Sequence, residues 1–180
     1  PGEPEGSVSP DGASLAGSDW KAKPIRLTTK QGGSLSALYI GGDQNAPVGA
    51  VVYSSGPRGG VSRIELVDFK RAKSASNFVA PDGVKRCAIS PNASRMLCTA
   101  NADFHGGETR ILLYDITKSD PLEKMSWTPY ASEKFNWTQA EIPCIEWVDN
   151  ARALPVNGSG QAVLWDLSGA KPKAVYQHDG

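Results

Sequence analysis

Three short apolar segments that each contain a late aspartate recur along the chain, and this repeat constrains the fold more than any other feature. They cover residues 63–69, 110–116 and 162–167. Each places apolar residues before the aspartate and one more apolar residue after it, a pattern typical of a half-buried β-strand. The aspartates are Asp68, Asp115 and Asp166, so the steps between them are 47 and 51 residues. A repeat of this length predicts propeller blades or a solenoid.

The segments between the aspartates predict further strands and tight turns in a similar order. The turn at 90–93 has the sequence Ser-Pro-Asn-Ala, whose residue types favour reversal of the chain. Pro121 and Pro172 each follow a strand-ending aspartate by six residues, and an outer strand is expected to open at each. Because no segment shows a sustained helical period, the chain is predicted to be all-β. The further predicted strands cover residues 13–18, 23–29, 35–40, 49–54, 84–90, 95–100, 121–127, 142–148, 152–156 and 171–177.

Composition narrows the classes of partner. The 180 residues include 19 glycines and 13 prolines, which suits many short strands joined by turns. The 19 basic and 19 acidic residues cancel, so the chain lacks the basic excess that favours nucleic acid or an anionic membrane. No apolar run approaches the roughly 20 residues needed to span a bilayer. We therefore expect neither nucleic acid nor membrane as a partner, and a cytoplasmic location is slightly favoured.

Two turns and the aspartate segments resemble the WD-repeat family of β-propellers. The relevant residues are Ser-Pro-Asp-Gly at 9–12, Ser-Pro-Asn-Ala at 90–93 and the Trp165-Asp166 pair, of which Val67-Asp68 and Tyr114-Asp115 are degenerate copies. The resemblance implies four-stranded antiparallel blades arranged around a channel. No unit carries the Gly-His dipeptide that the family places before a blade, so related propellers attached to serine peptidases, or those of periplasmic assembly proteins, stay open.

The repeat divides the chain into about four blade-like units. A disordered lead-in is expected at residues 1–7, followed by units at 8–34, 35–80, 81–130 and 140–180. Propellers usually have about 4–8 blades and close by pairing their first and last strands. We therefore expect this chain to be a piece of a longer protein and to form an open arc or partial propeller.

An aromatic segment between the third and fourth units is the leading candidate for partner binding. It contains Trp127, Tyr130, Phe135 and Trp137, and tryptophan and tyrosine are enriched at interface hot spots. By the resemblance it lies on a face where such propellers often bind partners. The alternative is that some of these rings pack between blades. The loops at 55–60 and 101–108 are secondary candidates.

Catalytic, metal and cofactor sites lack a supporting motif. His105 lies near Asp103 and Glu108, but no second histidine is close, which favours a polar turn over a metal site. No Gly-x-Ser-x-Gly, Cys-x-x-Cys or Gly-Lys-Ser/Thr pattern occurs. If a hairpin turns near Asn92, Cys87 and Cys98 fall opposite each other, as a cross-strand disulfide or as free buried thiols.

Two functions follow as expectations. The first is a non-enzymatic propeller module that serves as a protein–protein interaction scaffold, binding a protein or peptide without a cofactor. The second is the accessory or sensor propeller of a larger enzyme, linked to a peptidase or kinase domain outside this chain. Inference of function from fold alone is associational.

Overall fold

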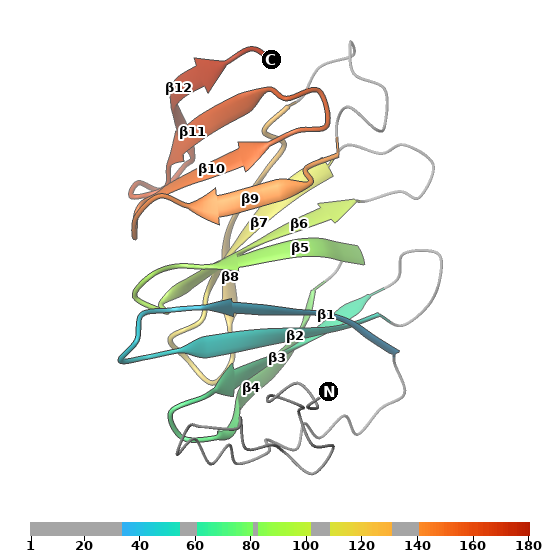
Figure 1. Cartoon of the computed structure of the whole chain (residues 1–180), viewed down its shortest axis with the longest axis vertical. Helices are drawn as coiled ribbons and strands as arrows, with labels where there is room; N and C mark the ends of the chain where they lie inside the picture. The colour runs from blue at the N-terminus through green and yellow to red at the C-terminus, as the bar shows by residue number, and fades with distance from the viewer. Residues whose placement is uncertain (1–33, 55–60, 81–82, 102–108, 131–140) are drawn as a thin grey trace, which may run out of the picture.

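The computed structural model describes residues 34–54, 61–80, 83–101, 109–130 and 141–180, and these residues form three four-stranded antiparallel sheets. Figure 1 shows the sheets stacked along the long axis, with the second sheet between the other two. Within the described residues, no helix is long and apolar enough to span a bilayer. The prediction of an all-β fold is confirmed.

Each sheet is a meander in which strands adjacent in the chain are paired. The first sheet contains β1 (Ser34–Gly41), β2 (Val48–Ser54), β3 (Ser62–Asp68) and β4 (Lys73–Ala80). The second contains β5 (Gly83–Ile89), β6 (Arg95–Asn101), β7 (Thr109–Asp115) and β8 (Leu122–Trp127). The third contains β9 (Cys144–Trp147), β10 (Arg152–Val156), β11 (Ala162–Asp166) and β12 (Lys173–His178).

The strand-ending aspartates build the turns that follow the third strand of each sheet. Asp68 Oδ1 accepts a hydrogen bond of 2.9 Å from the backbone N–H of Arg71. Asp166 Oδ1 accepts one of 2.9 Å from the backbone N–H of Ser168, and Asp115 makes the equivalent bond to Thr117 at 3.0 Å. A short carboxylate side chain caps a turn well because it reaches backbone donors two or three residues ahead. The repeated aspartates therefore mark the positions of the turns that follow the third strand of each sheet.

Neighbouring sheets meet through their first strands. Strand β1 lies against β5, and β5 lies against β9. The Tyr39 hydroxyl donates a hydrogen bond of 2.8 Å to the Lys85 carbonyl oxygen. In the next interface, Trp147 Nε1 donates one of 3.0 Å to the Ala88 carbonyl oxygen. In each interface, therefore, the polar atom of one aromatic side chain, Tyr39 or Trp147, hydrogen-bonds to the backbone of β5.

Two apolar cores fill the spaces between the sheets, because both faces of the second sheet carry buried residues. One core, between the first and second sheets, includes Ile64, Leu66, Met96 and Leu112, none more than 2% exposed. The other core, between the second and third sheets, includes Leu97, Ile111, Ile145 and Val163. Strand β7 reads as a continuous apolar run because its alternate residues enter opposite cores.

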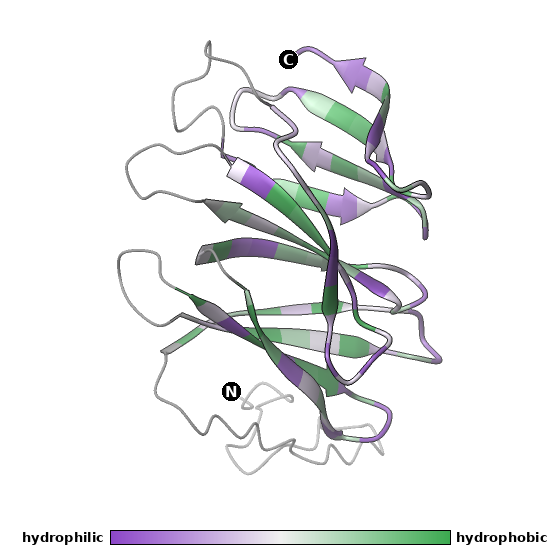
Figure 2. Cartoon of the chain, turned by 180° about the vertical axis from the view of Figure 1, so that it is seen from behind, coloured by the Kyte–Doolittle hydropathy of each residue, from purple (hydrophilic) through white to green (hydrophobic). Residues whose placement is uncertain are grey.

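The array is open, because the first and third sheets lie at opposite ends of the stack (Figure 1). Apolar residues remain exposed on the terminal sheets: Leu38 and Ile40 on β1, and Val175 and Tyr176 on β12, are each more than half exposed. Figure 2 shows that the coloured turns, which belong to the described residues, are mainly hydrophilic. Three of the predicted units contain the described sheets, while residues 1–33 lie outside the described part of the chain.

Three strands differ most from the sequence prediction. Strand β12 begins at Lys173, two residues later than expected. Strand β9 begins at Cys144, two residues later than expected, since Pro143 has no N–H to donate to a ladder. No strand is predicted at residues 73–80, because the polar first half of this segment has no proline to mark a start. Strand β4 is nevertheless a paired outer strand along the whole of β3.

Candidate functional site

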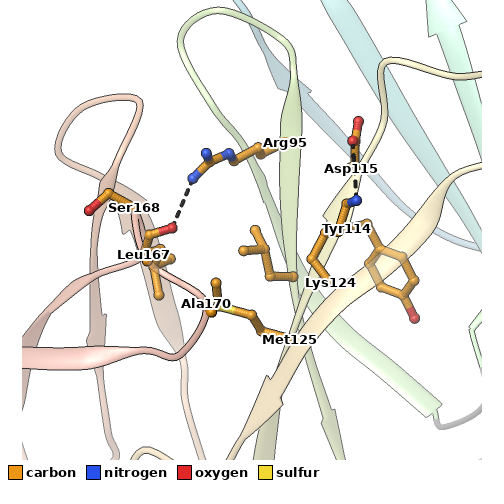
Figure 3. Close-up of a pocket in the computed structure, with 10 residues that line it drawn as sticks. Arg95, Tyr114, Asp115, Lys124, Met125, Leu167, Ser168 and Ala170 are labelled. Carbon is orange, nitrogen blue, oxygen red and sulfur yellow. Dashed lines mark hydrogen bonds and ion pairs between the residues drawn. The ribbon is translucent and has the colours of Figure 1, made fainter.

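A groove of about 350 Å³ lies between the second and third sheets, where β7 and β8 approach the turn that joins β11 to β12. Its volume is in the range of small-molecule and peptide side-chain pockets. Figure 3 shows its polar side chains around an apolar centre. The groove is lined by Arg95, Leu113, Tyr114, Asp115, Lys124, Met125, Leu167, Ser168, Gly169 and Ala170.

Arg95 forms one wall of the groove and ties the two sheets together. It is the first residue of β6, and its backbone N–H donates to Ser90 Oγ at 3.0 Å. Its guanidinium Nη1 donates a hydrogen bond of 3.0 Å to the Leu167 carbonyl oxygen of the third sheet. A guanidinium has five N–H donors in a planar fork, which suits binding of a carboxylate. The bond to Leu167 positions this fork at the groove.

Asp115 and Lys124 lie on the same sheet as Arg95, and Asp115 is paired with Arg95 across β6 and β7. The Lys124 Nζ atom lies 3.9 Å from Asp115 Oδ2, and the lysine side chain is 46% exposed. The Thr117 hydroxyl donates to Asp115 Oδ1 at 2.6 Å. The bonds from the Thr117 side chain and backbone lower the pKa of Asp115. The carboxylate therefore stays ionised and remains hydrogen-bonded to Thr117 within the turn. A surface ion pair of this kind is weak, which leaves Lys124 able to turn toward a ligand.

The floor of the groove is apolar. Leu113 and Leu167 are 2% and 1% exposed, and Met125 packs half-buried against the core between the second and third sheets. Small residues at Gly169 and Ala170 leave space above this floor. The unbranched methionine side chain adapts to differently shaped partners. The groove therefore combines an adaptable apolar surface with two cations and one anion.

A second groove of about 250 Å³ occupies the equivalent position between the first and second sheets. Asp68 and the turn residues Thr117 and Lys118 line it where Asp115, Ser168 and Gly169 line the first. The registers make Ser76 the counterpart of Met125, because Ser76 pairs with Leu66 and Met125 pairs with Leu113. The second groove thus has Ile116 in the place of Leu167 but a serine in the place of Met125, and the groove containing Met125 is the stronger candidate.

The structure places two of the four aromatic residues predicted to bind a partner. Tyr130 is buried, and its hydroxyl donates to the carbonyl oxygens of Pro155 at 2.7 Å and Gln161 at 3.1 Å. Burial raises the pKa of this hydroxyl. Trp127 is half-buried, with its ring centroid 5.8 Å from that of Trp165. Both match the alternative that rings of this segment pack between sheets, while partner binding by the segment stays a prediction.

The other sequence candidates lie outside the described residues. They are Phe135 and Trp137 of the aromatic segment, the loop at 55–60, and the loop residues 102–108, which include His105. Among the described residues, no group of three or more histidine, cysteine, aspartate or glutamate side chains has the arrangement of a metal site.

Sequence reasoning did not find the groove containing Met125. Its walls come from two different units, so no local motif joins Arg95 to Leu167 in the sequence. The repeat alone does not match Met125 to Ser76, because Met125 follows Asp115 by ten residues and Ser76 follows Asp68 by eight. The match comes from the strand registers.

The comparisons with known proteins support a β-propeller fold and go no further. No protein-family model and no curated protein sequence matches the chain. Among solved structures, it resembles the β-propeller domain of Cps50 (Swd1) from Myceliophteria thermophila, with a TM-score of 0.53 and 12% identity over 84% of this chain and 41% of that one.

Two peptidase structures are similar to a comparable degree. The β-propeller domain of the Trilobed protease from Pyrococcus furiosus, described as having an open velcro topology, gives a TM-score of 0.51 at 9% identity, covering 83% of this chain and 45% of that one. The acylaminoacyl peptidase of Pyrococcus horikoshii gives 0.50 at 13% identity, covering 82% and 25%. The chain thus spans less than half the length of these three structures. It has the β-propeller fold.

Proposed function

We propose that this chain is a non-enzymatic β-propeller module of the WD-repeat type, which binds a protein partner in the groove between its second and third sheets. The observation that supports this is the combination of an apolar floor, at Met125 and Leu167, with the cations of Arg95 and Lys124 at the edge of the same groove. A binding site of this kind needs an apolar surface and a few polar groups that fix orientation.

The groove suits a short peptide segment that carries an acidic side chain beside an apolar one. The apolar side chain would lie on Met125, and the carboxylate would accept hydrogen bonds from the guanidinium of Arg95 and from Lys124. Arginine and carboxylate groups pair through two parallel hydrogen bonds where geometry permits. Asp115 sits beside Lys124 and would repel a second carboxylate, which favours a single acidic residue in the partner.

A charge-reversal variant of the groove tests this function. We expect Lys124→Glu combined with Ala170→Glu to lower recovery of the partner at least tenfold in a quantitative pull-down, because both changes place negative charge where the partner presents its carboxylate. Both residues are exposed, so the variant is expected to fold. Circular dichroism and the unfolding temperature check this.

Lys118→Glu is the matched control, because Lys118 occupies the turn of the equivalent second groove. This variant is expected to recover the partner as the wild type does. Equal recovery by the folded groove variant and by the control would refute the assignment. A Trp137→Ala variant in the same experiment tests the aromatic segment as the partner surface instead.

The second candidate is an accessory propeller that presents substrate to a catalytic domain of a larger enzyme. It is favoured by the similarity to the β-propeller domain of the Trilobed protease and to the acylaminoacyl peptidase structure. The coding sequence on either side of this chain discriminates the two functions. A hydrolase or kinase domain there supports the second, whereas further propeller repeats alone support the first.

A further inference from the structure

We propose that Cys87 and Cys98 form an oxidation site, in which a peroxide converts two buried thiols into a disulfide that links β5 to β6. This inference is independent of the proposed function. The sequence left open a disulfide or two free thiols; both thiols are free in the structure, and their sulfur atoms lie 3.3 Å apart.

Their positions on the paired strands carry the proposal. Cys87 lies directly opposite Cys98, within the continuous register that pairs Arg86 with Thr99 and Ala88 with Leu97. The two Sγ atoms are 3.3 Å apart. Directly opposed residues of an antiparallel pair have Cα atoms about 4.5–5.5 Å apart, which falls within the range that disulfides tolerate. Small rotations about the two Cα–Cβ bonds therefore bring the sulfur atoms to bonding distance, about 2.05 Å.

The surroundings of the pair assign a role to each thiol. Cys98 is fully buried and Cys87 is 6% exposed, both in the core between the first and second sheets. Burial raises the pKa of the Cys98 thiol, and the hydrogen bond with Cys87 adds to this effect. Cys98 thus stays protonated and reacts slowly with an oxidant. Cys87 is the thiol that a small oxidant reaches first.

The chemistry needs one molecule of hydrogen peroxide for each disulfide. The Cys87 sulfur attacks one peroxide oxygen, the O–O bond breaks, and the products are Cys87 sulfenic acid and water. The Cys98 sulfur then attacks the Cys87 sulfur, loses its proton and displaces hydroxide, which leaves as a second water. The two thiols lose two electrons and two protons, and the peroxide is reduced to two waters.

Cys144 must be blocked before the experiment, because it is an exposed thiol that can link two molecules. Treatment of the folded, reduced protein with iodoacetamide alkylates Cys144 and leaves the buried pair. The protein is then divided into untreated and peroxide-treated samples. After unfolding in denaturant, we expect two alkylatable thiols in the untreated sample and none in the treated one.

Trypsin places the two cysteines on separate peptides, because Arg95 lies between them in the chain. We expect non-reducing mass spectrometry to detect peptide 87–95 joined to peptide 96–110, about 2 Da lighter than the sum of the two because two hydrogens are lost. Dithiothreitol should separate them. The proposal is overturned if both thiols remain alkylatable, or if they become sulfonic acids, each about 48 Da heavier, without the joined peptide.

A stability measurement gives a second readout. The bond restricts the unfolded chain, so the oxidised protein is expected to unfold at a temperature about 5 °C higher than the same sample after dithiothreitol. Dithiothreitol leaves any methionine sulfoxide in place, so this comparison isolates the disulfide. An unfolding temperature that dithiothreitol leaves unchanged or raises would contradict a bond that fits the native strands.

Discussion

Leu112→Ala is expected to lower the free energy of unfolding by about 3 kcal/mol, since it removes a buried side chain from a core that cannot collapse around the space. Leu112 is 1% exposed and lies on the middle sheet, in the core shared with the first sheet. Its backbone is paired on both sides, with β6 and with β8. The strand is therefore unable to move inward and fill the cavity. Urea unfolding followed by tryptophan fluorescence measures the change.

Leu122→Ala is the matched control for this substitution. Leu122 has the same side chain and belongs to the same sheet, but it is 53% exposed. The change is expected to alter the unfolding free energy by no more than about 0.5 kcal/mol. Similar losses in both variants would contradict the packing of the first sheet against the second.

Gly41→Ala is expected to cost about 2 kcal/mol, because it overfills the contact between the first strands of two sheets. A Cβ atom at Gly41 would lie 2.5 Å from Ile89 Cβ and 2.9 Å from the Ile89 carbonyl oxygen. The clash involves backbone of β5, so one of the two strands must shift. Replacement of glycine ordinarily stabilises a protein slightly through the unfolded chain, so a loss identifies the clash as the dominant effect.

Gly169→Ala controls for the general effect of replacing glycine. A Cβ atom there meets only the Lys171 carbonyl oxygen, at an ordinary contact distance of 3.7 Å. Its unfolding free energy is expected to stay within about 0.5 kcal/mol of the wild type. If Gly41→Ala is equally neutral in thermal and urea unfolding, β1 does not lie against β5 as described.

Local patterns predicted the strands because strand formation and turn chemistry depend on neighbouring residues. Strand β10 was predicted at its observed bounds, and the aspartates correctly marked where the third strand of each sheet ends. The opposition of Cys87 and Cys98 also followed from the position of one turn. Strand β4 was missed because its first half is polar, and only Phe78 and Ala80 near its end are apolar residues that alternate into the core.

The groove could not be predicted in the same way, because its residues meet only when two sheets pack. The aromatic segment attracted attention through composition, yet Tyr130 is buried and donates to two backbone carbonyls of the third sheet. Tyrosine and tryptophan combine an apolar ring with a polar atom, so they suit an interface between packed sheets as well as a surface that binds a partner. Sequence alone does not separate these two environments.

Photo-crosslinking from the groove tests the central claim most directly. Benzoylphenylalanine is placed at position 170, in the groove containing Met125, and in a separate protein at position 118, in the equivalent second groove. We predict that irradiation in extract of the source cells joins a distinct protein to position 170 alone. Adding Lys124→Glu should remove this adduct. The same adducts from both positions, no adduct at position 170, or an adduct there that persists with Lys124→Glu would contradict a partner-binding groove.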